Sequence, residues 1–174
     1  MFRPGKASSY RNAVSQQGVV IAGAAYTADE QTKAAFGKLN PYHHGVLPVL
    51  LLIENTTSQV ISLKKLRVEY VDYNGRHIEN VPSRDVPYLR GPDRPKVKVN
   101  PIPNLGRGKK NPLAALEIDT RAFGAKMLPP GDAAHGFFYF QAEHRPGAML
   151  YVTGLADAGT GKELFYFDVR LDAR

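Results

Sequence analysis

Residues Lys126–Phe140 read KMLPPGDAAHGFFYF, and this stretch decides the fold of the chain. Its Pro-Pro-Gly sequence at 129–131 ends one extended segment and turns the backbone, because proline fixes φ and glycine accepts positive φ. The four aromatic residues that follow alternate between the two faces of a strand, with Phe137 and Tyr139 on one side and the other two on the opposite side. We therefore predict a turn followed by a central strand of an antiparallel sheet.

Short strands separated by turn residues are predicted on both sides of this stretch. Period-2 alternation and β-branched or aromatic residues favour strands, and no helical period is sustained. The predicted segments are a strand at 18–27, a strand at 47–55, a strand at 59–63, a hairpin at 66–81 and strands at 148–157 and 162–172. In the last strand four apolar residues are expected to share one face: Phe165, Phe167, Val169 and Leu171.

Three local features refine this pattern. Asn74-Gly75 favours a two-residue type I′ turn in the predicted hairpin. Residues 28–39 are predicted to form a short helix or turn that ends at Gly37. Residues 111–123 are compatible with a helical turn or with an irregular edge segment, and the sequence leaves both open.

The pattern as a whole predicts an all-β protein with two packed antiparallel sheets and at most one or two short helices. With 174 residues the chain fits one domain. We expect a single sandwich domain at 17–174, with a loop insertion at 84–112 and a flexible basic N-terminal segment at 1–16.

Composition excludes several classes of protein. The chain contains no cysteine, so it has no disulfide bond, thiolate catalyst or cysteine-ligated metal site. The longest apolar run, Gly45–Ile53, is far shorter than the roughly 20 residues that span a bilayer, so no transmembrane segment is predicted. Residues 1–18 lack the continuous apolar region of a signal peptide. We expect either a cytosolic protein or an exported one whose leader has been removed.

Positive charge is concentrated in one segment. The net charge is +7, and residues 84–110 carry eight basic and two acidic side chains. Seven prolines between 82 and 112 forbid a helix and interrupt strand pairing, so we predict a long extended loop that adds little to the core and is protease-sensitive. The residues predicted to bind a partner are Arg90, Arg94, Lys96, Lys98, Arg107, Lys109 and Lys110.

Two interpretations of this basic loop stay open. Clustered Lys and Arg bind nucleic acid, anionic lipid or an acidic protein by releasing counterions. Tyr88 is the one aromatic residue between 84 and 110, so the stacking residues typical of single-strand binders are sparse. The alternative is a solvated loop, or an edge strand protected by lysines, that binds no partner.

Motifs for catalysis and metal binding are absent or incomplete. His43 and His44 are adjacent, so on a strand their rings would point to opposite faces, and a loop is the favoured interpretation. No Gly-x-Ser-x-Gly nucleophile motif or phosphate-binding loop occurs. Asn55-Thr56-Thr57 matches a glycosylation acceptor but is better explained as a turn. We predict no catalytic residue, no metal site and no cofactor.

Two groups of motifs resemble immunoglobulin-like accessory domains of exported bacterial proteins. The first is VLPVLLLIENTTSQVISLKKLRVEYVDYNGR at 46–76, where a turn follows a strand and an L-x-V-x-Y strand runs into a hairpin. The second is MLPPGDAAHGFFYF, LYVTGL and ELFYFDVRL, between 127 and 171. The resemblance covers about residues 45–172, and the basic loop departs from it. It implies an immunoglobulin-like antiparallel β-sandwich and export, and it transfers no site residue.

Three functional hypotheses remain. The first is a non-enzymatic immunoglobulin-like binding or structural module of an exported bacterial protein, which contacts a protein or an anionic surface. Such a module would be periplasmic, extracellular or lipid-anchored. The second is a nucleic-acid-binding β domain that uses the basic loop. The third is an enzyme whose site the motifs do not reveal.

Overall fold

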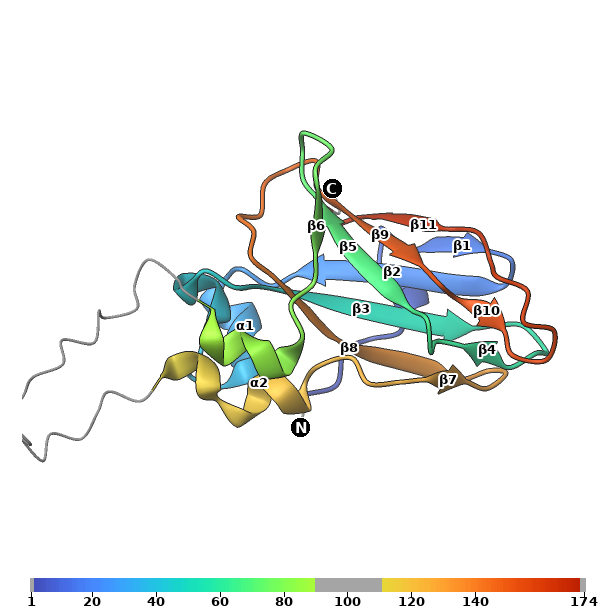
Figure 1. Ribbon diagram of the computed structural model, residues 1–174, viewed down its shortest axis with the longest axis horizontal. Coiled ribbons are helices and arrows are strands. Elements are labelled where there is room, and N and C mark those ends of the chain that lie inside the picture. Colours follow the sequence, from blue (N-terminus) through green and yellow to red (C-terminus); the bar gives the residue numbers. More distant parts are fainter. Residues whose placement is uncertain (1, 90–110, 173–174) are drawn as a thin grey trace, which may run out of the picture.

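The structure, a computed structural model, describes residues 2–89 and 111–172. The strands are β1 (Val14–Gln16), β2 (Val19–Ala25), β3 (Leu47–Asn55), β4 (Ile61–Ser62), β5 (Arg67–Val71), β6 (His77–Glu79), β7 (Met127–Leu128), β8 (Ala133–Phe140), β9 (Met149–Thr153), β10 (Ala156–Asp157) and β11 (Phe167–Arg170). The helices are α1 (Asp29–Phe36) and α2 (Leu116–Thr120), with 3-10 turns η1 (Ala7–Ser9), η2 (Pro41–His44), η3 (Ser83–Tyr88) and η4 (Pro112–Ala114). In these residues the strands form antiparallel sheets A (β1-β2-β3-β8), B (β10-β4-β7) and C (β11-β9-β5-β6), shown in Figure 1.

Strand β3 lies inside sheet A and is buried on both faces. Leu51 and Ile53 point into the core between sheets A and C, whereas Leu50 and Leu52 face the helices. A run of apolar residues without alternation suits a strand covered on both sides. Pro48 fits near the start of β3. Its carbonyl accepts a hydrogen bond from the amide of Tyr26, which lies just beyond the end of β2. Because the β2–β3 ladder has already ended there, the N–H that proline lacks removes no ladder hydrogen bond.

Strand β8 confirms the alternation of the aromatic residues. Phe140 packs between the two sheets, while Phe137 and Tyr139 pack against the helical layer. The predicted turn before it is also present, with Gly131 at φ 79°. The prediction of a central position is wrong, since β8 is the last strand of sheet A and short bridges from Val81 and Ala122 cover its outer edge.

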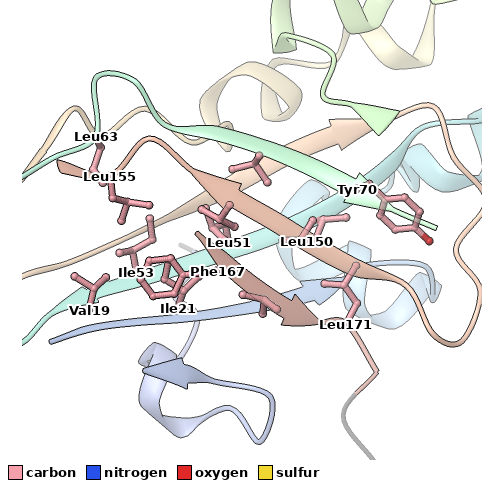
Figure 2. Packing of buried hydrophobic residues seen from close by; sticks show 14 of the residues in the cluster. Val19, Ile21, Leu51, Ile53, Leu63, Tyr70, Leu150, Leu155, Phe167 and Leu171 are labelled. Carbon is pink, nitrogen blue, oxygen red and sulfur yellow. The ribbon is translucent and has the colours of Figure 1, made fainter. Parts of the chain in front are cut away.

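The main core lies between sheets A and C (Figure 2). Leu150 of β9 and Leu171 after β11 both approach Gly23 of β2, where an added Cβ would lie only 3.1 Å from each of them. The sheets can therefore pack closely at this point because residue 23 has no side chain. The all-β antiparallel sandwich is confirmed.

A second core lies on the other face of sheet A, under α1, α2 and the 3-10 turns. Helix α1 ends at Gly37, with φ 66°, as the sequence predicts. Of the two alternatives for 111–123, the helical one is correct, because η4 and α2 fall there. Two short α-helices within the described residues agree with the expected helix content.

The β5–β6 hairpin is confirmed, but its turn differs from the prediction. A type I′ turn needs positive φ at both central residues, and here only Gly75 has it, at 80°. The Asp72 carboxylate instead accepts hydrogen bonds from the amides of Asn74 and Arg76, which favours a longer loop. The two-residue turn with positive φ occurs between β1 and β2, at Gln17 (51°) and Gly18 (75°).

The N-terminal segment was expected to be flexible over residues 1–16, and for residues 2–16 the structure corrects this. Ala7 is buried, and β1 pairs with β2 through Val14–Gln16. The Asn12 amide donates to the carbonyls of Gly23 and Arg170, so it links both sheets. The basic residues near the start of the chain favour a solvated segment, so the sequence did not predict that Ala7 and Asn12 pack against the domain.

The ends of the predicted loop insertion are also corrected. Val86 in η3 is fully buried, and Leu113 in η4 is buried beside it in the second core. Residues 84–89 therefore contribute to the core, against the expectation for 84–112. In the last strand, Phe167 is buried as predicted, but Phe165 is 70% exposed because β11 begins two residues after it.

Candidate functional site

The residues predicted to bind a partner are not placed by the structure. Arg90, Arg94, Lys96, Lys98, Arg107, Lys109 and Lys110 lie outside the described residues. Their role in binding stays a prediction.

The histidine pair lies in the 3-10 turn η2, which agrees with the predicted loop. Nε2 of His43 is 3.4 Å from Oδ1 of Asp29, and this ion pair is exposed. Within 2–89 and 111–172, no group of three or more His, Asp or Glu side chains is arranged to hold a metal ion.

Asn55 is confirmed as a turn residue. Its side chain is buried, and its amide donates to the carbonyls of Gln59 and Leu128. Its Oδ1 accepts from the Thr57 amide at 2.9 Å. The side chain is therefore committed to closing the β3–β4 turn and joining it to β7.

A tyrosine, a histidine and an aspartate form a chain of hydrogen-bonding groups beside the core. The Tyr70 hydroxyl is 3.1 Å from Nδ1 of His144, and Nε2 of His144 is 3.3 Å from Oδ1 of Asp172. The other Asp172 oxygen accepts from the Gly147 amide, and the His144 amide donates to the Tyr42 hydroxyl. We call Tyr70, His144 and Asp172 the inner cluster. It ties the β8–β9 loop to sheet C and to the end of β11.

The inner cluster has the residue types of a nucleophilic site but not the access. Tyr70 is fully buried, at one end of the row of core side chains in Figure 2. Burial raises the pKa of Tyr70 to about 12, so the phenolate that would attack a substrate is disfavoured at neutral pH. The arrangement of these groups is that of a structural clamp.

The outer face of sheet C carries a different arrangement. Strand register places Asp168, Tyr151, Glu69 and Glu79 in one row across the four strands, and Arg170, Met149, Val71 and His77 in the next row. Thr153 and Arg67 form a third, shorter row. In the described residues no helix or further strand lies on this face (Figure 1). We call these ten residues, with Tyr166 just before β11, the outer face.

An ion network fixes the β5–β6 side of the outer face. The side chain of Glu69 is only 12% exposed, and its two oxygens lie 2.8 Å from Arg67 and 2.9 Å from Nδ1 of His77. Arg67 also reaches the Glu79 carboxylate. Because Glu69 is largely desolvated and paired twice, this network holds the neighbouring rings in one geometry.

Aromatic rings form a platform beside this network. The Tyr151 ring lies 5.4 Å from the His77 ring and 5.4 Å from the Tyr166 ring, at 37° to the latter. Tyr166 is 55% exposed. Its backbone carbonyl accepts a hydrogen bond from the side-chain amide of Gln16, and the backbone amide of Phe165 donates to Oε1 of Gln17. The β1–β2 hairpin therefore holds the segment that presents the platform.

Two charged residues beside the platform have no ionic partner in the described part of the chain. Asp168 stands opposite Tyr151, and Arg170 stands opposite Met149. Their side chains are exposed. A shallow hollow of about 900 Å³ adjoins the outer face at Met149 and Arg170, and its other lining residues are Pro146, Gly147, Ala148, Leu171 and Asp172. The face thus offers an apolar platform with uncommitted donors and acceptors beside it.

Sequence reasoning placed part of this site correctly. It put Phe165, Phe167, Val169 and Leu171 of the last strand on one face. Alternation then leaves Tyr166, Asp168 and Arg170 to the opposite face, and the structure confirms that Asp168 and Arg170 are exposed. It missed Tyr151, His77 and Glu69, because each lies on another strand and only the register brings them together. The sequence does contain one sign of their position. Glu69 alternates with Val68 and Tyr70, and Tyr151 alternates with Leu150 and Val152, which indicates that both residues lie on the face opposite the core.

Comparison with known proteins shows a distant structural likeness. No protein-family model matches the chain, and no curated protein matches it. Among solved structures, the chain is similar to MPT63, a secreted protein from Mycobacterium tuberculosis, with 11% sequence identity and a TM-score of 0.40. The match covers 94% of this chain and 95% of that one. Likeness at this level gives no basis for transferring a function.

No helix within the described residues has the length and apolar character needed to cross a bilayer.

Proposed function

We propose that this protein is a non-enzymatic binding module of an exported bacterial protein and that its contact surface is the outer face. The observation that carries the proposal is the platform formed by Tyr151, which is half-buried, and Tyr166, which is exposed, on a sheet that covers a core with its other side. Aromatic side chains bring large contact area at low entropic cost, so they are enriched where proteins bind.

The outer face is held in place before any ligand arrives. Glu69 fixes Arg67 and His77, while Gln16 and Gln17 fix the backbone of the segment that carries Tyr166. Ordering side chains during association costs free energy, so a rigid platform favours binding.

The non-enzymatic part of the proposal is supported by the inner cluster. Its tyrosine hydroxyl is buried and hydrogen-bonded. Burial raises the pKa of Tyr70, so its phenolate form is even less populated at neutral pH than in an ordinary tyrosine. The three groups that most resemble a catalytic constellation are thus used to hold a loop.

Export is proposed on the sequence resemblance to accessory domains. The basic loop is proposed as a second, separate contact to an acidic or anionic partner, because it concentrates positive charge that the outer face does not carry. Binding of nucleic acid through this loop is the alternative, and a steep fall of affinity with salt is its signature.

The proposal is tested by sedimentation with envelope fragments of the source bacterium at 500 mM salt, which screens an electrostatic contact of the basic loop. The wild-type protein is expected to co-sediment, and the double variant Tyr151→Ala/Tyr166→Ala is expected to stay in the supernatant. Tyr88→Ala is the matched control, because Tyr88 is 78% exposed and lies in η3, away from sheet C. Equal sedimentation of all three proteins, or none for any of them, would overturn the proposed contact surface.

A further inference from the structure

We infer that the outer face binds a neutral, linear polysaccharide. The inference rests on the proposed function and names the ligand of the same surface. It follows from three properties of the outer face: its shape, its balance of charge, and the alternation of apolar rings with hydrogen-bonding groups.

Shape favours an extended ligand. The outer face is the open side of a four-stranded sheet, and its residues stand in rows across the strands. Pockets for small molecules are concave and bury most of the ligand, which an open sheet face cannot do. A chain-like ligand that lies across the strands gains contact with several rows at once.

The charge of the outer face disfavours a charged polymer. Asp168, Glu69 and Glu79 are opposed by Arg67 and Arg170, so the formal charge is −1 with His77 neutral. Nucleic acids and acidic polymers need clustered cations, and three carboxylates repel them. For a cationic chain, Glu69 and Glu79 already share the single positive charge of Arg67, which weakens their attraction for a further cation. A ligand without net charge meets neither obstacle.

The same charges disfavour a protein surface as the occupant. Interface cores between proteins are depleted of Asp, Glu and Lys, because such groups must be desolvated on association. On the outer face, Asp168 and Glu69 flank Tyr151 directly in the central row. A flat protein partner over Tyr151 would have to cover the exposed Asp168 carboxylate, which has no cation paired with it in the described residues.

A polysaccharide matches this arrangement chemically. A sugar ring has an apolar C–H face, which can stack on an aromatic ring, and hydroxyl groups at its rim, each of which both donates and accepts. Tyr151 and Tyr166 supply the stacking surface. Asp168 can accept from hydroxyls and Arg170 can donate to them, and neither has an ionic partner in the described residues. Bridging waters can complete the remaining contacts.

The inference is tested by NMR titration of the ¹⁵N-labelled protein with neutral hexasaccharides of β-1,4-linked glucose, mannose, xylose and N-acetylglucosamine. At least one is expected to shift the amides of β5, β9 and β11. Affinity should fall at least tenfold in Tyr151→Ala and in Tyr166→Ala. Because Tyr166 is exposed, the second substitution should leave the fold intact. Affinity should stay unchanged in Tyr88→Ala. Because the ligand is uncharged, raising the salt concentration from 50 to 500 mM should change the affinity less than twofold.

Polygalacturonate, an oligolysine and single-stranded DNA serve as charged probes in the same experiment. Binding of none of the four hexasaccharides, binding that survives both tyrosine variants, or binding of the charged probes alone would overturn the inference. Envelope fragments separate this failure from failure of the proposed function. If sedimentation depends on the two tyrosines but is abolished by protease and spared by periodate, the contact surface stands and its ligand is a protein.

Discussion

The two sides of sheet C carry the same kinds of residue in opposite settings. The inner cluster joins Tyr70, His144 and Asp172, and the outer face joins Tyr151 and His77 with Glu69. Tyr70 and Glu69 are neighbours on β5, and the strand's alternation sends them to opposite sides. One step along the chain therefore separates a clamp from a platform.

The difference teaches that solvent access, more than residue identity, decides what such a group can do. On the inner side the hydroxyl is the buried end of the cluster, so its hydrogen bond stabilises the fold and its ring is inaccessible. On the outer side the carboxylate is the buried end, the His77 side chain is about half exposed and Tyr151 is half-buried. Mutation of the inner cluster should therefore mainly change stability, and mutation of the outer face should mainly change binding.

The largest effect is expected from His144→Ala. Removing this ring leaves the Tyr70 hydroxyl and Asp172 without their shared partner, and should lower the free energy of unfolding by about 2–3 kcal/mol. His77→Ala, the matched variant on the outer face, should cost less than about 0.5 kcal/mol. Urea unfolding of both proteins measures the two values. Equal costs would show that the two clusters do not differ as described.

The next effect is a loss of stability in alkali. The pKa of Tyr70 in the folded protein is about 12, above its usual value of 10.0. The unfolded chain then releases this proton first, so the contribution is complete below pH 10 and is lost as the pH rises toward 12. The slope is about 1.4 kcal/mol per pH unit for one such group.

Tyr70→Phe isolates this contribution from that of Tyr26, whose pKa burial also raises to about 12. Near pH 8 the variant should be less stable than the wild type by about 1 kcal/mol, from the lost hydrogen bond. The gap should close between pH 10 and 11 and then reverse, because the variant has one fewer group to ionise on unfolding. Unfolding curves from pH 8 to 11.5 decide this, and a constant gap would contradict it.

A smaller effect is expected within the outer face. Glu69→Gln removes the charge that both Arg67 and His77 contact, and should cost about 1 kcal/mol. Glu79→Gln is the control, since its carboxylate is far more exposed and should contribute about 0–0.5 kcal/mol. The Tyr151 ring-proton NMR shifts should move only in the first variant. A reversed order of the two costs would remove the argument that Glu69 organises the face.

The smallest effect on stability is expected from Gln17→Gly. Glycine relieves the positive φ of 51° but loses the hydrogen bond to the Phe165 amide, so the two changes should cancel to within about 0.5 kcal/mol. Hydrogen exchange at Phe165 should nevertheless become faster. Unchanged exchange would mean that the β1–β2 hairpin does not support the platform.

The sequence predicted the fold well where local chemistry decides it. The proline–glycine turn at 129–131, the alternation of the aromatic residues in β8, and the end of α1 at Gly37 all follow from backbone preferences. The packed positions of Ala7 and Val86 did not follow, because their burial depends on contacts with segments remote in sequence.

The candidate site could be predicted only in part, for the same reason. The polar side of β11 is visible as alternation, but Tyr151 and Glu69 join it through the register of β9 and β5. Register between strands so far apart in the chain is fixed by packing of the inner faces, not by local propensity. The outer face is therefore a product of tertiary structure.

The burial of β3 on both faces has a consequence for how the chain reaches its folded state. β3 needs β8, which begins at Ala133, to complete its ladder, so much of the chain must be made before β3 is covered. Until then Leu50, Leu51 and Leu52 form an exposed, uncharged stretch that is prone to intermolecular pairing. Truncated chains that end before β8 should aggregate. Long-range pairing of this kind also slows folding.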